Sequence, residues 1–289
     1  MSMLSPVLLY GRMIKFSHSI FALPFALSGA VLAAATHGIH PPRLAWIVIA
    51  MVAARSAAMG FNRLVDRQID ADNPRTARRE LPSGDMSVTA VVLFVVLSSV
   101  VLVLAAWQLN RLCLLLSPVA LAIVFTYSYT KRFTWASHLV LGMALALAPL
   151  GAWIAVTGRF DLPPVILGLA VMSWVAGFDI LHSCQDHDFD QIAGLHSIPV
   201  RFGLAGALRL ARFLHLLAVF FMIGLGVSAG LQVVYYVGVA GIAGLLLYEH
   251  RLVTPQDMTQ VNTAFMTMNS LVSVAFFVFT LADLLWMGE

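Results

Sequence analysis

Charged residues are scarce in this sequence, and so are cysteines. Of 289 residues only 11% are Asp, Glu, Lys or Arg, whereas 60% are hydrophobic and the mean hydropathy is +0.89. A soluble globular domain carries about 25% charged residues, so this composition excludes that class. The two cysteines, Cys113 and Cys184, have no close partner in sequence, which excludes a disulfide framework and a cysteine-based zinc site.

Apolar runs that can cross a bilayer occupy most of the chain. A membrane-spanning helix needs roughly 20 mainly apolar residues. Nine runs meet this requirement, so we expect an all-α, polytopic membrane protein in which residues 1–289 form one membrane-embedded domain. The expected spans are 17–36, 44–66, 88–109, 112–129, 137–157, 164–184, 205–228, 231–248 and 262–287. The first run has the length of a span and exceeds the apolar segment of a signal peptide.

The basic residues predict the orientation of these spans. Lys and Arg gather in cytoplasmic loops of membrane proteins. With nine spans and a cytoplasmic N-terminus, the breaks on the cytoplasmic side hold most of them: Arg12, Lys15, Arg63, Arg67, Arg75, Arg78, Arg79, Lys131, Arg132, Arg201, Arg209, Arg212 and Arg251. The opposite side receives only Arg43, Arg111 and Arg159. Because the basic residues lie between apolar runs and form no basic face, we expect no nucleic-acid partner.

Two clusters of carboxylates follow the second and sixth expected spans. Asn62, Asp66 and Asp70 are spaced by four residues, which places them on one helical face if the helix continues that far. In the second cluster Asp179, Asp186 and Asp190 fall at i, i+7 and i+11, again one face of a continuous helix, with His182 between them. Both clusters belong to the predicted cytoplasmic side.

Aligned carboxylates repel one another, and a bound cation relieves that repulsion. Hard oxygen ligands favour Mg²⁺, which binds through a few carboxylates together with substrate phosphates. We call Asn62, Asp66 and Asp70 the first stripe and Asp179, Asp186 and Asp190 the second stripe. We predict that the two stripes face each other and together hold Mg²⁺ and a diphosphate. Nearby cations supply further countercharge. The candidates for this role are Arg75, Arg79, Lys131, Arg132 and Arg201.

Other interpretations of these residues exist. Either cluster alone is compatible with solvated charges at helix ends, and this is the expected role of the acids off the stripes, Asp72, Glu80, Asp85 and Asp188. A cation transporter also places carboxylates on helix faces, but near the bilayer midplane. Arg55 lies within an apolar run and shares the stripe of Asn62, so it needs a partner or an aqueous cavity.

The two spacings resemble the motifs of the UbiA superfamily of intramembrane prenyltransferases, NxxxDxxxD and DxxxxxxDxxxD. The segments 21–25 (FALPF), 74–84, 129–134 (YTKRFT) and 194–199 (GLHSIP) are also similar. The resemblance implies a nine-helix bundle around a central cavity, and an enzyme of the bacterial inner membrane whose site faces the cytoplasm. It implies transfer of a polyprenyl group from a polyprenyl diphosphate to an aromatic acid, with no obligate protein partner.

The resemblance also assigns candidate roles. Mg²⁺ ligands would be Asn62, Asp66, Asp70, Asp179, Asp186 and Asp190; diphosphate ligands would be Asn62, Arg75, Arg79, Lys131 and Arg132; catalytic residues would be Arg55, Asp66, Asp186 and His182. Many members have Tyr where this chain has His182. The surrounding string is similar to a subgroup that acts on 4-hydroxybenzoate, some of whose members use 1,4-dihydroxy-6-naphthoate, so both acceptors stay open. Haem O and lipid ethers are products of more distant relatives.

Aromatic and histidine side chains complete the candidates. We expect Phe21, Tyr127, Tyr129, Trp153 and Trp174 to be packing or interfacial residues, with a cavity role as the alternative. His138 is expected to be a hydrogen-bonded interior histidine. His182 is either a proton acceptor or a hydrogen-bonded cavity residue.

Overall fold

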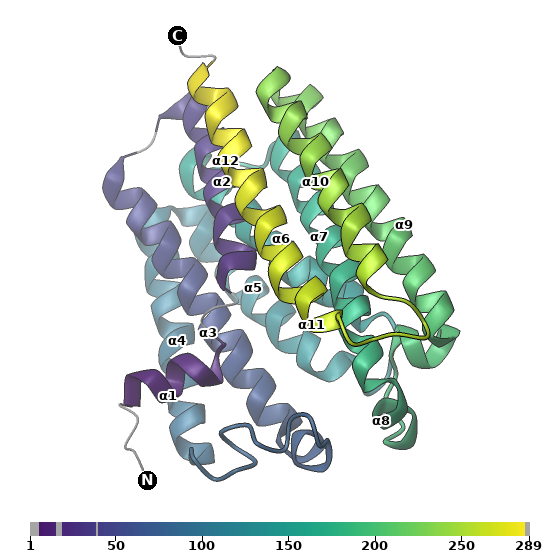
Figure 1. The fold of residues 1–289 in the computed structure, drawn as a ribbon. Helices are drawn as coiled ribbons and strands as arrows, with labels where there is room; N and C mark the ends of the chain where they lie inside the picture. The colour runs from purple at the N-terminus through teal and green to yellow at the C-terminus, as the bar shows by residue number, and fades with distance from the viewer. Residues whose placement is uncertain (1–5, 16–18, 39, 287–289) are drawn as a thin grey trace.

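The computed structural model describes residues 6–15, 19–38 and 40–286, and these residues are predominantly helical (Figure 1). The short helix α1 crosses one end of a bundle of longer, roughly antiparallel helices. The elements are α1 Pro6–Met13, α2 Ser19–His37, α3 Pro41–Asp72, α4 Val88–Leu109, α5 Arg111–Thr130, α6 Ser137–Thr157, α7 Leu162–Ser183, η2 Cys184–Asp186, α8 His187–Ile192, α9 Ile198–Ala229, α10 Val233–Leu252, α11 Val261–Thr263, η3 Ala264–Met268 and α12 Asn269–Trp286.

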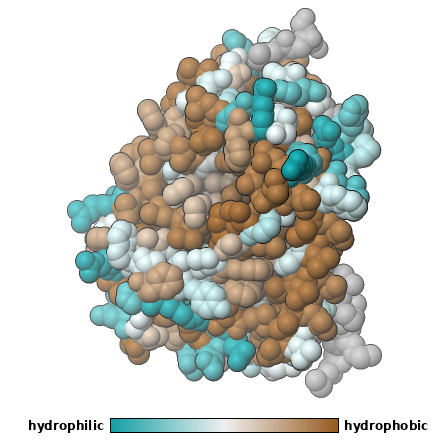
Figure 2. All heavy atoms as spheres, turned by 180° about the vertical axis from the view of Figure 1, so that it is seen from behind, coloured by the Kyte–Doolittle hydropathy of each residue, from teal (hydrophilic) through white to brown (hydrophobic). Residues whose placement is uncertain are grey.

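Eight helical segments of the described chain are long and apolar enough to cross a membrane. They correspond to the second through ninth expected spans. The first expected span corresponds to α2, whose apolar part, Phe21–His37, is shorter; its predicted start at residue 17 lies outside the described residues. The total of nine spans therefore stays a prediction. Apolar side chains cover much of the face in Figure 2, and hydrophilic ones lie mostly toward its ends.

Local sequence explains many of the helix boundaries. The side chains of Ser87 and Asn110 accept hydrogen bonds from the amides of Ala90 and Cys113, capping α4 and α5. Gly158 and Gly230 end α6 and α9 with positive φ angles of 73° and 68°, which glycine adopts without a Cβ clash. The seventh span was expected to begin at residue 205, but α9 already begins at Ile198 and has a kink at Gly203.

Helix α7 lies at the centre of the bundle. Of its membrane-length window 72% is buried within the protein, against 22% for α4 and 17% for α5. The Trp174 ring packs against Phe25 and Phe178, with centroids 5.0 and 4.9 Å away, and Phe25 in turn stacks on Phe276. Because α7 is held by this core, the side chains at its end have a fixed position in the bundle.

Candidate functional site

A polar chamber lies at the bundle end where α3 and α7 finish. Its volume is about 190 Å³. All six residues of the two predicted stripes line it: Asn62, Asp66, Asp70, Asp179, Asp186 and Asp190. Helix α3 continues to Asp72, so the first stripe lies on one helix as expected.

The second stripe is built differently from the prediction. The sequence spacing assumed one continuous helix from Asp179 to Asp190, but α7 ends at Ser183, and the 3₁₀ turn Cys184–Asp186 and the short helix α8 follow. A 3₁₀ turn tightens the backbone and redirects the chain. The three carboxylates nevertheless line the same chamber, together with Ser183 and Phe189 of this segment.

A longer apolar cavity adjoins the polar chamber. Its volume is about 380 Å³, and its lining extends from Asn62 to Ile47 along α3 and from Leu141 to Ala155 along α6, mostly through alanines and leucines. The two spaces share five lining residues: Asn62, Arg79, Tyr127, Asp179 and His182. The site therefore joins a charged compartment to a hydrocarbon-like one at a defined boundary.

Asp66 is held by charge more than by hydrogen bonds. Its Oδ2 accepts from the Asn62 amide at 2.9 Å and lies 3.2 Å from the Lys131 ammonium. Arg132 Nη2 is 3.1 Å from Oδ1, but it donates to the Val65 carbonyl. The buried Oδ1 therefore has a cation beside it and no hydrogen-bond partner in the part of the chain that the structure describes.

Asp70 and Asp186 pair with arginines from the loop after α3. Arg79 Nη1 donates to both Asp70 oxygens at 2.7 Å. Arg75 binds Asp186 in a two-pronged contact, Nε to Oδ1 at 2.8 Å and Nη2 to Oδ2 at 2.5 Å. Burial alone would lower the pKa of Arg75, but the Asp186 hydrogen bond and charge raise it above its ordinary value.

Asp179 has a different partner, His138 on α6, which the sequence interpretation placed among interior histidines. His138 Nδ1 lies 2.7 Å from Asp179 Oδ2, and the Ile198 backbone N–H points to Nε2 at 3.4 Å. A backbone N–H can only donate, so Nε2 is the acceptor in this contact and Nδ1 is the nitrogen that faces Asp179. Asp179 thus pairs with a histidine, where Asp66, Asp70 and Asp186 each pair with Lys or Arg.

The remaining predicted residues occupy distinct places. His182 lies at the boundary, stacks on Phe265 at 4.2 Å, and has its Nδ1 3.2 Å from the Gln185 amide. Arg55 lines the apolar cavity and donates to the carbonyls of Ile14 and Lys15 at 3.4 and 3.1 Å. Its buried Nε has no hydrogen-bond partner among the described residues.

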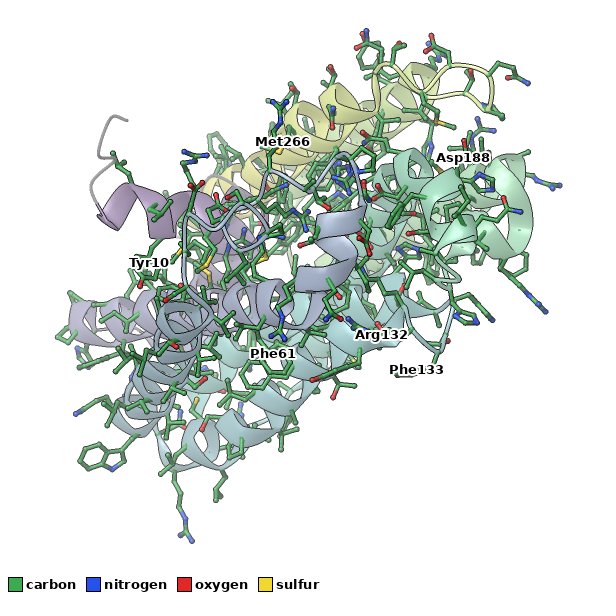
Figure 3. All side chains as sticks on the ribbon, turned by 90° about the horizontal axis from the view of Figure 1, so that it is seen from below. Tyr10, Phe61, Arg132, Phe133, Asp188 and Met266 are labelled. Atoms are coloured by element: carbon green, nitrogen blue, oxygen red, sulfur yellow. The ribbon has the colours of Figure 1, made fainter. Side chains whose placement is uncertain are left out.

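Arg132 does not line the polar chamber. Its two Nη atoms donate to the Ser128 and Val65 carbonyls at 3.0 and 2.9 Å. In the view onto this end of the bundle (Figure 3), Arg132 lies near the middle and Asp188 lies on α8 toward the edge. A diphosphate-binding role for Arg132 stays a prediction, whereas Lys131 reaches the chamber directly.

Two basic residues were assigned only a topological role from the sequence. Arg63 is 3% exposed, lies 4.0 Å from Asp70 and donates to the Met13 carbonyl. Lys15 lines the apolar cavity and has a left-handed φ of 46°, unusual for a residue with a Cβ. Burial, followed by the charges of Arg79, Arg63 and Arg75, lowers the pKa of Lys15 to about 8.

The acidic residues off the stripes and the five candidate aromatics differ in exposure. Asp72, Asp85 and Asp188 are exposed as expected, but Glu80 is buried, with Arg12 Nε at 3.9 Å, so its solvated role was wrong. The prediction that the aromatics pack holds for Phe21, Trp153 and Trp174, which belong to the buried core. Phe21 and Tyr127 also line the apolar cavity, which was the alternative, and the 45% exposure of Tyr129 agrees with an interfacial position.

The donor set fits a hard divalent cation. The chamber offers five carboxylates and the Asn62 side chain, and the buried Asp66 Oδ1 accepts no hydrogen bond from any described residue. Among the described residues no three His, Cys, Asp or Glu side chains lie close enough to hold a metal as a ready-made group. Mg²⁺ requires less than that, because it keeps several waters and shares its coordination with substrate phosphates.

Comparison with known proteins supplies the identification. The sequence model described as the UbiA prenyltransferase family matches residues 22–271. The chain belongs to this family. It is accordingly an integral membrane enzyme of the prenyltransferase class.

Two similar members of the UbiA family share one name. The 4-hydroxybenzoate octaprenyltransferase of Sodalis glossinidius is 33% identical over 237 residues, 80% of this chain and 79% of the relative. That of Nitrosospira multiformis is 32% identical over 222 residues, 77% and 76% of the two chains.

Solved structures share the fold. A UbiA homolog from Aeropyrum pernix has a TM-score of 0.81 and 31% identity, covering 94% of this chain and 98% of that one. A homolog from Archaeoglobus fulgidus, solved with GPP and Mg²⁺, has a TM-score of 0.77 at 19% identity, with 96% and 99% covered. This second likeness establishes a common fold.

Proposed function

We propose that this UbiA-family enzyme transfers a polyprenyl group from a polyprenyl diphosphate to a ring carbon of an aromatic acid, with 4-hydroxybenzoate as the acceptor. The observation that carries the proposal is the boundary formed by Asn62, Arg79, Tyr127, Asp179 and His182, where the charged chamber meets the apolar cavity. An allylic diphosphate has the same two-part character. Its reacting C–O bond would lie at this boundary.

The chamber residues would hold the diphosphate end. Arg75, Arg79 and Lys131 are the cations that line it, and each now pairs with a carboxylate that a metal ion can take over. Mg²⁺ would be held by Asn62, Asp66, Asp70, Asp179, Asp186 and Asp190, and when bound it supplies charge stabilisation for the departing diphosphate. Exchange of partners keeps every charge compensated as substrate binds.

The apolar cavity would hold the prenyl chain. A volume of about 380 Å³ equals roughly a dozen water-sized volumes of 30 Å³. A long polyprenyl tail exceeds this, so its distal part must continue into lipid. This fits an enzyme embedded in the bilayer, which we place in the bacterial inner membrane with the chamber toward the cytoplasm.

The chemistry follows from this placement. The C–O bond breaks with its electron pair on the diphosphate oxygen, and the allylic carbon is left with positive charge close to aromatic faces. The electron-rich ring carbon of the acceptor then forms the C–C bond and loses its proton to a base. We assign this role to His182 at the boundary, and we assign binding of the acceptor carboxylate to Arg55, whose Nε has no hydrogen-bond partner within the described residues.

The proposal is tested with purified protein, Mg²⁺ and a polyprenyl diphosphate, offering 4-hydroxybenzoate and 1,4-dihydroxy-6-naphthoate separately. The products are identified by mass. Prenylated 4-hydroxybenzoate is the expected result. Product only from the naphthoate would reassign the acceptor and keep the chemistry, whereas no product from either would contradict the proposed function.

A further inference from the structure

A buried polar network lies outside the chamber, around Asn269 at the start of α12. Asn269 on α12 and Glu249 on α10 are both 0% exposed. A buried polar side chain is costly in a membrane protein unless it is paired, so such residues mark structural or functional positions. Neither residue lines the polar chamber or the apolar cavity.

The orientation of the Asn269 amide is fixed by its neighbours. The Trp174 indole N–H can only donate, and it lies 2.8 Å from Asn269 Oδ1. The amide nitrogen therefore faces three acceptors, Glu249 Oε1 at 2.8 Å and the carbonyls of Ala264 and Phe265 at 3.2 Å each. One side chain thus connects α7, α10 and the backbone before α12.

That backbone has an unusual conformation. Residues Ala264–Met268 form the π-helix η3, and short π-helical turns occur often at functional sites. A π-turn shifts the register of backbone hydrogen bonds and leaves carbonyls that need other partners. Asn269 supplies a donor to two of them, Ala264 and Phe265, and so stabilises the turn.

The π-helix presents Phe265 to the cavity. The Phe265 ring stacks on His182 with a centroid distance of 4.2 Å and contacts Phe21 and Phe178 at 5.4 and 5.5 Å. All four rings line the apolar cavity, next to the boundary with the chamber. An aromatic acceptor entering there would meet this wall of rings.

We propose that Asn269, held by Glu249 and Trp174, is a positioning residue: it fixes the π-helix so that Phe265 packs on His182 and completes the acceptor side of the cavity. The inference rests on the proposed function for the identity of the acceptor. It adds a specificity element in which Asn269, Glu249 and Trp174, none of which lines the cavity, act through Phe265, which does.

The first test compares Michaelis constants for geranyl diphosphate and 4-hydroxybenzoate in Asn269→Ala, Phe265→Ala and the double variant. Each single variant is expected to raise the KM of the acceptor about tenfold, the size associated with losing a buried hydrogen-bonded partner, while the KM of the diphosphate stays unchanged. If Asn269 acts through Phe265, the double variant is no worse than Phe265→Ala. Additive losses, or an equal rise for the diphosphate, would overturn the inference.

Asp283 provides a matched control on the same pair of helices. It is also 0% exposed on α12, and its carboxylate accepts from the Gln232 and Tyr235 amides at 2.7 and 2.9 Å, capping the far end of α10. Asp283→Ala should lower thermal stability and leave the KM of the acceptor unchanged. The same KM change in this variant would mean that Asn269 is merely structural.

Two further measurements cover poor folding and inactivity. Glu249→Gln keeps an oxygen that can accept from Asn269, so the acceptor KM should stay at the wild-type value. Glu249→Leu removes that oxygen and should raise the acceptor KM as Asn269→Ala does.

Independently of turnover, diethyl pyrocarbonate should modify His182 faster in Asn269→Ala than in the wild type, at the rate seen in Phe265→Ala. An unchanged rate would contradict the inference even if the proposed acceptor is wrong, and absence of turnover in the wild type would contradict only the proposed function.

Discussion

The guanidinium of Arg75 binds the carboxylate of Asp186 through both of its prongs, at 2.8 and 2.5 Å, and thereby joins the loop after α3 to the segment after α7. Asn73 Nδ2 also donates to Asp186, to Oδ1 at 3.1 Å. The two acidic stripes are thus connected through a basic residue. A diphosphate that binds between them would offer Arg75 a second anion.

Replacing Arg75 should weaken binding of the prenyl diphosphate. Arg75→Gln is expected to raise the KM of the diphosphate about tenfold or more with a smaller change in kcat, because it removes a two-pronged charged contact present before the bond breaks. Steady-state kinetics at saturating acceptor measure this. Arg78→Gln is the matched control, since Arg78 is an exposed arginine of the same loop. A loss confined to kcat would contradict this role.

The lowered pKa of Lys15 predicts that kcat/KM depends on pH. Its pKa is lowered to about 8, so the ammonium is charged below this pH and neutral above it. If the charge helps to bind the diphosphate, kcat/KM falls as the pH rises through about 8 in the free enzyme. In Lys15→Arg the guanidinium stays charged and this fall should disappear between about pH 7 and 9. An identical pH profile in the wild type and in Lys15→Arg would exclude a role for the Lys15 charge in diphosphate binding.

Gly151 tests the path of the prenyl chain. It lies on α6, 13 residues beyond His138 or about 20 Å along the helix at 1.5 Å per residue, and its Cα faces open space in the apolar cavity. Gly151→Leu should block long donors and leave dimethylallyl diphosphate unaffected. Gly244→Leu, at an exposed glycine of α10 with open space around it, should leave chain-length preference unchanged. Equal rates with long donors in both variants would place the chain elsewhere.

Gly142 tests the packing that brings His138 to Asp179. A Cβ at Gly142 would lie 2.3 Å from the Met172 carbonyl oxygen, so α6 and α7 would have to move apart. Gly142→Ala should lower the free energy of unfolding by about 1–3 kcal/mol, as overpacking does. Thermal denaturation in detergent measures the change. Gly244→Ala meets no atom within 4 Å and should be neutral or slightly stabilising.

Much of this organisation could be predicted from sequence, because its signals are local. The i, i+4 spacing of Asn62, Asp66 and Asp70 needs only a continuing helix, and α3 supplies one as far as Asp72. Hydropathy likewise located eight membrane-length segments. The second stripe was placed in the right region, but its spacing could not reveal the turn at Cys184–Asp186.

The missed features depend on contacts between distant segments. His138 and Asp179 are 41 residues apart, and Arg63 and the Met13 carbonyl are 50 apart. Such pairs leave no periodic signal in one sequence. The π-helix at Ala264–Met268 was also missed, because its stabilising partners, Glu249 and Trp174, come from other helices.

The central claim is that two carboxylate stripes bind Mg²⁺ and the diphosphate together. The most direct measurement is prenyl transfer by Asp66→Ala and Asp186→Ala across a Mg²⁺ titration. Asp188→Ala is the control, because Asp188 lies between Asp186 and Asp190 in the sequence but its side chain is 95% exposed. The account predicts that EDTA abolishes transfer, that both stripe variants lose about a hundredfold or more in kcat/KM, and that Asp188→Ala behaves as wild type. Full activity in either stripe variant, or an equal loss in Asp188→Ala, would contradict it.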